Sequence, residues 1–376
     1  MVRSYVAAGF CHSLFVDPDG GAWGCGSNKY GQLGIGTDTE SLVPKIIENL
    51  PKIQSVAAGN FHSLFLDVDG GVWATGTGRN GELGTGNFNS RRQPGRIENI
   101  PPIQAVSANG FSSILLDTTG GIWTFGCNEE GQLGHGDSND RSTPERIENL
   151  VKIQKIASGT YHTLLIDEEG SAFTCGNNYY GQLGHGDQEN RDRFEKIENI
   201  PCLKSASAGG NYSLFLDIDG GVWSCGDNVS GELGLGLTGM KFQPKKVNIP
   251  ETQAIVAGSC HSLFIDTNGC AFSCGKNTYG QLGLGDHANR HVPEPIKDLP
   301  MIGSIAAGSS YSFFVDVEGV VWTCGQNVDY QLGIGQNNVD YTTQPQRVDS
   351  ELRLTYDVES RKGWRTKSAR NLVITL

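Results

Sequence analysis

The sequence predicts an all-β fold, a seven-bladed β-propeller whose blades are four-stranded antiparallel sheets of about 50 residues each. Three observations lead to this prediction. Glycine supplies 52 of the 376 residues, roughly twice its average share of ~7%, so the chain makes many tight turns. Apolar runs are short and end at glycine or aspartate, as strands do. An aromatic residue recurs every 49 or 50 positions, at Trp23, Trp73, Trp123, Phe173, Trp223, Phe272 and Trp322.

The second repeat shows the expected elements in order. Residues 53–59 (IQSVAAG) and 62–67 (HSLFLD) are short apolar runs bounded by glycine and aspartate, which predicts two buried or half-buried strands. Residues 67–71 (DVDGG) supply the aspartate and the glycine that a tight hairpin turn requires. Residues 71–76 (GVWATG) are expected to form the third strand.

A glycine-rich loop and an outer strand complete each repeat. In the second repeat the fourth strand is expected at residues 94–100 (PGRIENI), because a proline can begin an outer strand without losing a ladder hydrogen bond. Four short strands repeated seven times are typical of the radial arrangement of a propeller. A β-solenoid built from the same units is the alternative fold.

One closed domain is expected over residues 1–348, followed by a basic C-terminal tail at residues 349–376. The tail carries six basic and four acidic side chains, and Trp364 lies in it outside the repeated aromatic position. Three roles are open for the tail: a basic interaction arm, a weak nuclear-localisation signal, or extra strands packed on the propeller. The chain begins with the first strand of a repeat and ends its seventh repeat with a fourth strand, so neither terminus supplies a strand to the other's blade. Closure of the ring should therefore rest on contacts between the first and last blades or on the tail.

Charge and composition exclude several classes of protein. The formal net charge is −12, whereas a protein that binds nucleic acid directly needs a basic surface. No apolar run approaches the ~18 residues of a membrane-spanning helix, so no membrane partner is expected. Ten cysteines without an apolar leader segment indicate reduced thiols and an intracellular protein, cytoplasmic or nuclear. We expect a monomer.

Four motifs recur along the chain: Gly-x-x-His-Ser/Thr, Asp-x-x-Gly, Trp-x-x-Gly and Asn-x-x-Gly-Gln-Leu-Gly. One position is aspartate in all seven copies, at Asp17, Asp67, Asp117, Asp167, Asp217, Asp266 and Asp316. This combination resembles the regulator of chromosome condensation repeat family over residues 1–348. The resemblance implies a seven-bladed propeller. The founding member of that family is a guanine-nucleotide exchange factor for the small GTPase Ran and is bound to chromatin through nucleosomes.

The chain departs from several members of that family. No interval between repeats exceeds 50 residues, whereas the exchange factor carries an inserted β-wedge that would lengthen one interval. The loops that carry tryptophan in the plant ultraviolet-B photoreceptor carry none here, which excludes photoreception. The tail is too short to hold the HECT domain of the ubiquitin-ligase relatives.

No catalytic, cofactor or metal site is predicted. One position in four repeats is histidine, but serine or tyrosine fills it elsewhere, and seven-fold placement spreads these side chains too widely to hold one ion. A structural hydrogen bond is the expected role of His12, His62, His162 and His261. A recurring cysteine position accepts Phe125 in the third repeat, so it is an apolar packing position.

The candidate partner-binding residues are those that differ between repeats, because the recurring residues build the scaffold. Aromatic residues cluster in the loops between the first and second strands of repeats one to four, at Phe10, Phe61, Phe111 and Tyr161. Residues 104–203 hold fifteen acidic and seven basic side chains, which would steer a basic partner. Candidates from this acidic sector and from the tail are Glu129, Glu130, Glu168, Glu169 and Trp364.

The sequence therefore predicts a non-enzymatic protein-interaction scaffold of the regulator of chromosome condensation type, which binds a partner through loops on one propeller face. The alternative is an exchange factor or regulator of a Ran-like small GTPase. Chromatin or histone binding is a third hypothesis, through basic histone segments or the basic tail.

Overall fold

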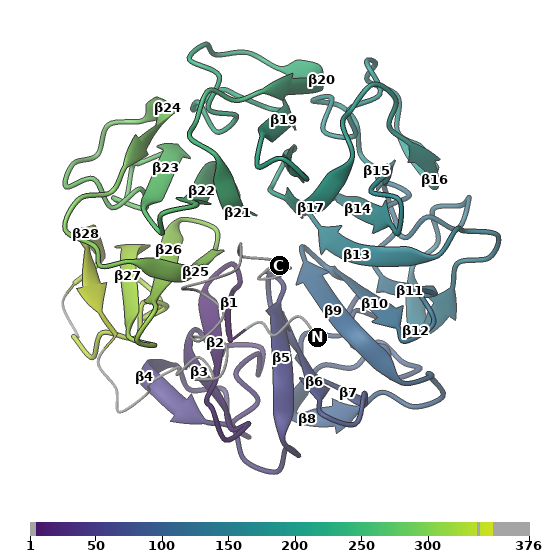
Figure 1. The fold of residues 1–376 in the computed structure, drawn as a ribbon. Helices are drawn as coiled ribbons and strands as arrows, with labels where there is room; N and C mark the ends of the chain where they lie inside the picture. The colour runs from purple at the N-terminus through teal and green to yellow at the C-terminus, as the bar shows by residue number, and fades with distance from the viewer. Residues whose placement is uncertain (1–4, 337–338, 349–376) are drawn as a thin grey trace, which may run out of the picture.

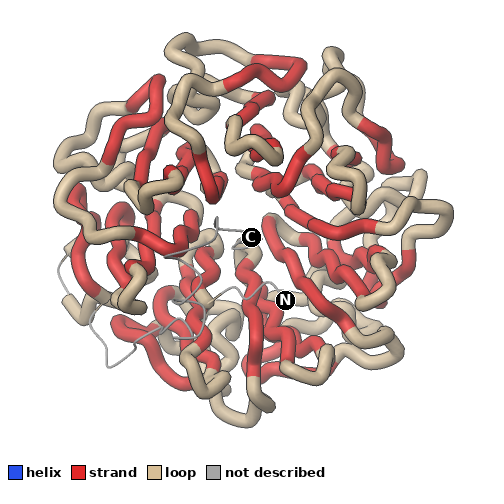
Figure 2. The backbone as a smooth tube through the Cα atoms, in the orientation of Figure 1, coloured by secondary structure: helices blue, strands red, loops and turns tan. Residues whose placement is uncertain are grey.

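The structure, a computed structural model, describes residues 5–336 and 339–348. The described residues form 28 strands in seven four-stranded antiparallel sheets, which surround a central channel as blades (Figure 1). The predicted seven-bladed β-propeller is confirmed. Strands and loops account for all the described residues (Figure 2), and these contain no helix with the length and apolar character needed to span a membrane.

Each blade is a meander in which the four strands pair in chain order. The blades are, in order, β1–β4 (Val6–Ala8, His12–Val16, Ala22–Gly26, Ser41–Ile46), β5–β8 (Ile53–Ala58, His62–Asp67, Val72–Gly76, Arg91–Arg96), β9–β12 (Ile103–Asn109, Ser112–Asp117, Ile122–Gly126, Arg141–Arg146), β13–β16 (Ile153–Ser158, His162–Asp167, Ala172–Gly176, Arg191–Lys196), β17–β20 (Leu203–Ala208, Tyr212–Asp217, Val222–Gly226, Lys241–Lys246), β21–β24 (Thr252–Ala257, His261–Asp266, Ala271–Gly275, Arg290–Pro295) and β25–β28 (Ile302–Ala307, Tyr311–Asp316, Val321–Gln326, Tyr341–Arg347).

The outer strand of the second blade begins three residues earlier than expected. It spans Arg91–Arg96, so Pro94 lies inside it and not at its start. Gly95 pairs with Ala74 and Arg91 pairs with Gly76, with a register shift between the two pairs. Pro94 falls within this bulge, where the ladder does not require its missing N–H.

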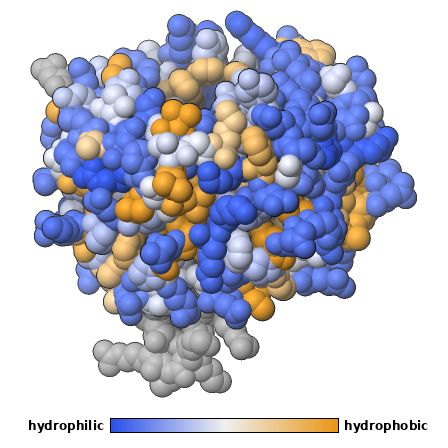
Figure 3. Space-filling view, turned by 90° about the horizontal axis from the view of Figure 1, so that it is seen from above, coloured by the Kyte–Doolittle hydropathy of each residue, from blue (hydrophilic) through white to orange (hydrophobic). Residues whose placement is uncertain are grey.

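The hydrophobic core lies between neighbouring blades. The second strand of each blade is buried along its whole length, whereas the outer strands are largely exposed. One cluster of buried side chains joins Leu64 and Val72 of the second blade to Leu115 and Phe125 of the third. Seen side-on, the surface is mainly hydrophilic with scattered apolar residues (Figure 3).

The first and seventh blades contact each other directly. The Ser309 N–H donates to the Gly9 carbonyl at 3.3 Å, and the Tyr311 hydroxyl donates to the His12 carbonyl at 2.6 Å. The Phe15 ring packs edge-on against Phe313, with centroids 5.5 Å apart. The ring is thus closed by packing between two blades that each form from one continuous segment. The predicted packing of the tail falls outside the described residues.

Candidate protein-interaction face at the mouth of the channel

Strand direction sorts the loops onto two faces. Because the strands of a blade alternate in direction, the loops between the first and second and between the third and fourth strands lie at one end, here named the mouth face. The hairpin turns between the second and third strands lie at the other end with the links between blades, here named the turn face. The Val68 N–H of a hairpin turn donates to the Lys52 carbonyl of a link at 3.0 Å, as this arrangement requires.

Four aromatic rings from three blades meet on the mouth face. The ring of Phe61 lies 5.7 Å from Phe10, 5.1 Å from Tyr30 and 6.1 Å from Phe111, measured between centroids. We call Phe10, Tyr30, Phe61 and Phe111 the aromatic cluster. Phe10 keeps 48% of its surface exposed and the other three rings are half-buried. The structure therefore brings three of the sequence-predicted aromatic residues together.

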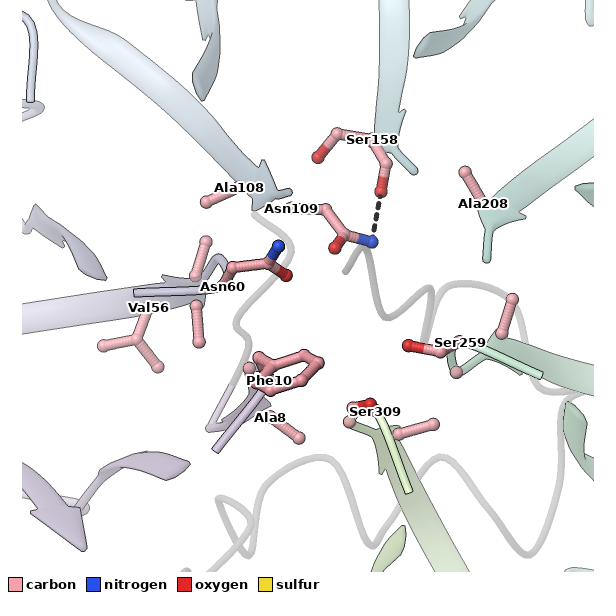
Figure 4. Close-up of a pocket in the computed structure, with 17 residues that line it drawn as sticks. Ala8, Phe10, Val56, Asn60, Ala108, Asn109, Ser158, Ala208, Ser259 and Ser309 are labelled. Atoms are coloured by element: carbon pink, nitrogen blue, oxygen red, sulfur yellow. Dashed lines mark hydrogen bonds between the residues drawn. The ribbon is translucent and has the colours of Figure 1, made fainter. Parts of the chain in front are cut away.

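The aromatic cluster borders the opening of the channel. A small residue ends six of the seven inner strands, and in β9 it is the last but one, before Asn109. These small residues allow the strands to converge there: Ala8, Ala58, Ala108, Ser158, Ala208, Ala257 and Ala307. The Phe10 ring projects into this opening beside Asn60 (Figure 4). The Asn109 side chain bridges two blades by donating from Nδ2 to the Ser158 carbonyl at 3.1 Å.

Two cations stand beside the aromatic cluster. Lys29 and Arg79 occupy equivalent positions in the loops between the third and fourth strands of the first two blades, and both are exposed. The guanidinium carbon of Arg79 lies 5.9 Å from the centre of the Tyr30 ring, within the range of a cation–π contact. The sequence prediction missed Lys29, Tyr30 and Arg79. They could have been found because the two positions just before the recurring Gly-Gln/Glu-Leu-Gly motif differ from repeat to repeat.

The predicted acidic residues do not form one surface. Glu129 and Glu130 lie in the loop after β11, on the mouth face, whereas Glu168 and Glu169 lie in the hairpin turn after β14, on the turn face. The Glu168 carboxylate pairs with Lys152 at 2.6 Å. A single partner surface cannot use both pairs without spanning the thickness of the propeller.

A further predicted aromatic residue is not part of the aromatic cluster. Tyr161 lies in the fourth blade on the mouth face and keeps 39% of its surface exposed. Trp364 lies outside the described residues.

The recurring histidines join blades by hydrogen bonds. His12 Nε2 lies 2.9 Å from Ser63 Oγ in the next blade, and the Ser63 hydroxyl donates to the Gln32 carbonyl at 2.6 Å. Since that hydroxyl has a single hydrogen, it accepts from His12, which places the imidazole proton on Nε2. The same histidine-to-hydroxyl contact recurs from His62, His162 and His261 to Ser113, Ser213 and Ser312.

Burial keeps these histidines neutral. It lowers the pKa of His12 and His162 to about 3 and that of His62 and His261 to about 4, because a charged imidazolium would lose its hydration. Tyr212 and Tyr311 fill the same position in two blades and donate to the carbonyls of His261 and His12. The position therefore serves blade-to-blade bonding.

The recurring thiols are inert. Burial raises the pKa of Cys25 far above its usual range, and Cys225, Cys274 and Cys324 behave alike. Among residues 5–336 and 339–348, no group of three or more His, Cys, Asp or Glu side chains is placed to hold a metal ion.

The chain matches models of known families along most of its length. A model described as RCC1-like domain matches residues 142–363. A model of the regulator of chromosome condensation (RCC1) repeat matches residues 19–66 and 69–116, and a second model of that repeat matches residues 4–32, 53–82 and 103–132. A comparison with curated protein sequences gave no match.

Several solved structures are similar. Prp20p from Saccharomyces cerevisiae, described with its binding properties to Gsp1p and histones, has a TM-score of 0.81 and 25% identity over 90% of this chain and 87% of its own. Yeast RCC1 (Prp20) bound to Kap60 gives a TM-score of 0.82 with 22% identity, over 97% of this chain and 93% of its own. Human WBSCR16 has a TM-score of 0.75 and 23% identity, over 82% of this chain and 84% of its own.

The family model that covers residues 142–363 spans more than half of the chain, and the repeat models match the blades that precede it. The fold agrees with these matches, since all seven blades repeat one four-stranded meander. The chain therefore belongs to the regulator of chromosome condensation (RCC1) repeat family.

Proposed function

We propose that this propeller is a non-enzymatic scaffold that binds a protein partner through its mouth face. The aromatic cluster is the observation that carries the proposal. Recurring residues such as His62 and Ser63 form hydrogen bonds between blades. In contrast, the aromatic cluster presents partly exposed rings on loops. Large aromatic side chains of this kind are enriched at the centres of protein interfaces.

Site-directed photo-cross-linking tests the proposal. The photoreactive residue p-benzoylphenylalanine replaces Phe10, which keeps an aromatic ring in the channel opening, and the protein is irradiated in a lysate of its host. The matched control carries the same residue at Phe242, an exposed aromatic position on the outer strand β20 of the fifth blade. We expect a discrete cross-linked protein from position 10 that position 242 does not give. Equal labelling at both positions would contradict the proposal.

A second candidate function is nucleotide exchange on a Ran-like small GTPase. The similarity to Prp20p, whose binding properties to Gsp1p are described, favours it. The even repeat spacing provides no inserted wedge of the kind that the resemblance implies for exchange factors. Release of a fluorescent GDP analogue from a purified Ran-like GTPase is the test. Faster release with catalytic amounts of this protein supports exchange activity, and an unchanged rate contradicts it.

Histone binding is the third candidate, supported by the same similarity to Prp20p, which is also described with its binding to histones. A net charge of −12 is compatible with basic histone segments. Co-sedimentation of the protein with reconstituted nucleosomes tests this candidate. Sedimentation that is lost at moderately raised salt would indicate electrostatic binding, and no sedimentation at low salt would contradict it.

A further inference from the structure

Two cations on the mouth face have no ion-pair partner among the residues that the structure describes. Lys29 precedes Tyr30 in the chain, and the guanidinium carbon of Arg79 lies 5.9 Å from the centre of the Tyr30 ring. Both side chains are exposed. Three arginines elsewhere, Arg141, Arg191 and Arg290, are each paired with two carboxylates.

The position of Arg79 suits it to hold a carboxylate. A guanidinium that lies over an aromatic ring keeps N–H groups at its edge free, and those groups match the two oxygens of a carboxylate. Its guanidinium already lies over Tyr30, so less side-chain entropy is lost when an anion binds. Lys29, the residue before Tyr30 in the chain, adds a second exposed positive charge in the loop that carries Tyr30.

We propose that the aromatic cluster, Lys29 and Arg79 form one docking site for a short segment of a partner protein in which an apolar side chain adjoins several carboxylates. The inference rests on the function proposed above and names the chemistry of the partner. The apolar side chain contacts Phe10 and Phe61, and the carboxylates pair with the two cations. Charge complementarity at the site favours this occupant, since Lys29 and Arg79 are exposed and have no ion-pair partner among the described residues. Burial raises the pKa of the Asp329 carboxyl near Cys11 and so disfavours its negative charge.

The neighbouring carboxylates do not offer an equal site for a basic segment. Glu130 lies on the same face, but its Oε2 already accepts hydrogen bonds from Asn177 at 3.0 Å and Asn190 at 2.7 Å. This oxygen therefore already serves as an acceptor that joins the third and fourth blades. The chain's net charge of −12 repels highly acidic partners at a distance, so a segment with only a few carboxylates fits best.

Single-stranded nucleic acid is the rival occupant, because bases stack on aromatic rings and phosphates pair with cations. Such binding requires a positive track along the strand. Glu129 is exposed on the same face in the third blade, and two cations make a spot and not a track. The protein segment is therefore the occupant that the charges favour.

Fluorescence anisotropy with synthetic probes tests the proposal on the full chain. The probe is the labelled peptide DEDLFSGS, and the controls are KRKLFSGS, DEDAASGS and a twelve-residue oligo-dT. We expect saturable binding of DEDLFSGS, with affinity at least about tenfold above that for each control, and weaker binding at higher salt. Preferred binding of the basic peptide or of oligo-dT would overturn the proposal.

Variants locate the binding. The double substitution Lys29→Glu and Arg79→Glu changes only exposed side chains and should lower the affinity for DEDLFSGS about tenfold or more, as should Phe10→Ala. The controls Lys245→Glu and Phe242→Ala, on the outer strand of the fifth blade, should bind the peptide as the unaltered protein does. Thermal denaturation checks that each variant folds. Undiminished binding by the folded charge-reversal variant would overturn the proposal.

The two proposals fail in different ways. If the photo-cross-linker at position 10 captures a discrete partner while DEDLFSGS does not bind, the acidic–apolar chemistry is overturned and the scaffold function stands. If positions 10 and 242 capture the same proteins and DEDLFSGS does not bind, the scaffold function and the docking site are both overturned. Binding of DEDLFSGS that depends on Arg79 and Phe10 supports the docking site.

Discussion

At the scale of single residues, the recurring aspartate locks the hairpin turn of each blade. In the second blade Asp67 Oδ1 accepts from the backbone N–H groups of Asp69 at 3.0 Å and Gly71 at 2.7 Å, and Oδ2 accepts from Trp73 Nε1 at 3.1 Å. The fourth blade carries Phe173 where the second has Trp73, so its turn lacks the indole donor. The aspartate is thus needed in every blade, while the tryptophan can be replaced.

Comparing Asp67→Ala with Asp167→Ala isolates the tryptophan bond. Asp67→Ala leaves three donors without their acceptor and should lower the free energy of unfolding by about 3 kcal/mol. Asp167→Ala releases only the two backbone donors of its turn and should cost about 1 kcal/mol less, because a typical hydrogen bond contributes ~0.5–1.5 kcal/mol net. Urea denaturation of both variants measures the difference. Equal losses would contradict a stabilising role for the Trp73 bond.

The buried histidines make stability depend on pH. Their pKa values are lowered to about 3 or 4 in the folded protein, against about 6.5 in an unfolded chain, so the unfolded state binds more protons between these values. The stabilisation is therefore complete above about pH 6.5 and is lost as the pH falls toward 4. Burial also raises the pKa of Glu232 to about 6, and this carboxyl has the opposite effect, since its contribution favours folding at the lower pH.

The substitution His62→Tyr tests the origin of this pH dependence. Tyrosine occupies the same position in the fifth and seventh blades, so the blade contact has a native precedent. We expect the free energy of unfolding to fall less in the variant than in the unaltered protein between pH 7 and pH 5. The two slopes should differ by up to about 1.4 kcal/mol per pH unit, the value for one proton. Denaturation curves at several pH values measure this slope. An unchanged slope would show that His62 does not titrate as its burial predicts.

At the scale of elements, a glycine at or next to the end of each third strand lets the chain turn into the long loop of the mouth face. Gly76 ends β7 with a φ of 107°, and a Cβ atom there would lie 2.3 Å from the Phe61 carbonyl oxygen. Gly239 also has a positive φ, of 96°, but a Cβ atom there would meet nothing within 4 Å. At both positions the backbone would be strained for an alanine, but only at Gly76 would the added methyl group also clash.

The pair Gly76→Ala and Gly239→Ala separates strain from steric clash. Gly239→Ala should lower the free energy of unfolding by about 1–2 kcal/mol, the cost of a left-handed backbone for an alanine. Gly76→Ala should cost a further ~1–3 kcal/mol, because the backbone of the neighbouring strand must move to accommodate the methyl group. Thermal or chemical denaturation measures both variants. A smaller loss for Gly76→Ala than for Gly239→Ala would contradict the steric argument.

The repeating elements could be predicted from the sequence because the same local chemistry occurs seven times. The spacing of Trp23, Trp73 and Trp123 gives the size of a blade, and the turn sequences give three of its strand boundaries. The start of the fourth strand could not be placed. A β-bulge absorbs Pro94 inside the strand, and a bulge depends on pairing with β7 that the local sequence does not encode.

The candidate site was only partly predictable because it combines loops from different blades. Phe10, Phe61 and Phe111 were found because they lie in the loops between the first and second strands, but Tyr30 and Arg79 lie in the loops between the third and fourth strands, which approach them only when neighbouring blades pack. Counting strand reversals would have separated Glu129 and Glu130 from Glu168 and Glu169, since each strand of a meander reverses the direction of the chain.

At the scale of the whole molecule, the interface between the first and seventh blades differs from the other six. Elsewhere a short link joins each outer strand to the next inner strand, whereas these two blades meet at opposite ends of the described chain. The side-chain contacts are nevertheless the same. Tyr311 donates to the His12 carbonyl across the closing interface, and Tyr212 donates to the His261 carbonyl across the interface of the fifth and sixth blades.

Removing the same hydroxyl at the two interfaces tests whether the closing contact controls opening of the ring. Tyr311→Phe and Tyr212→Phe each leave one buried carbonyl without its side-chain donor and should each lower the free energy of unfolding by about 1–3 kcal/mol. Only Tyr311→Phe weakens an interface that no link holds together, so it should also speed local opening of the ring. In Tyr311→Phe, hydrogen exchange is measured in the first blade, β1 to β4. In Tyr212→Phe, it is measured in the fifth blade, β17 to β20. We expect the faster exchange in Tyr311→Phe. Equal exchange in the two variants would show that packing alone holds the closing interface as firmly as a chain-linked one.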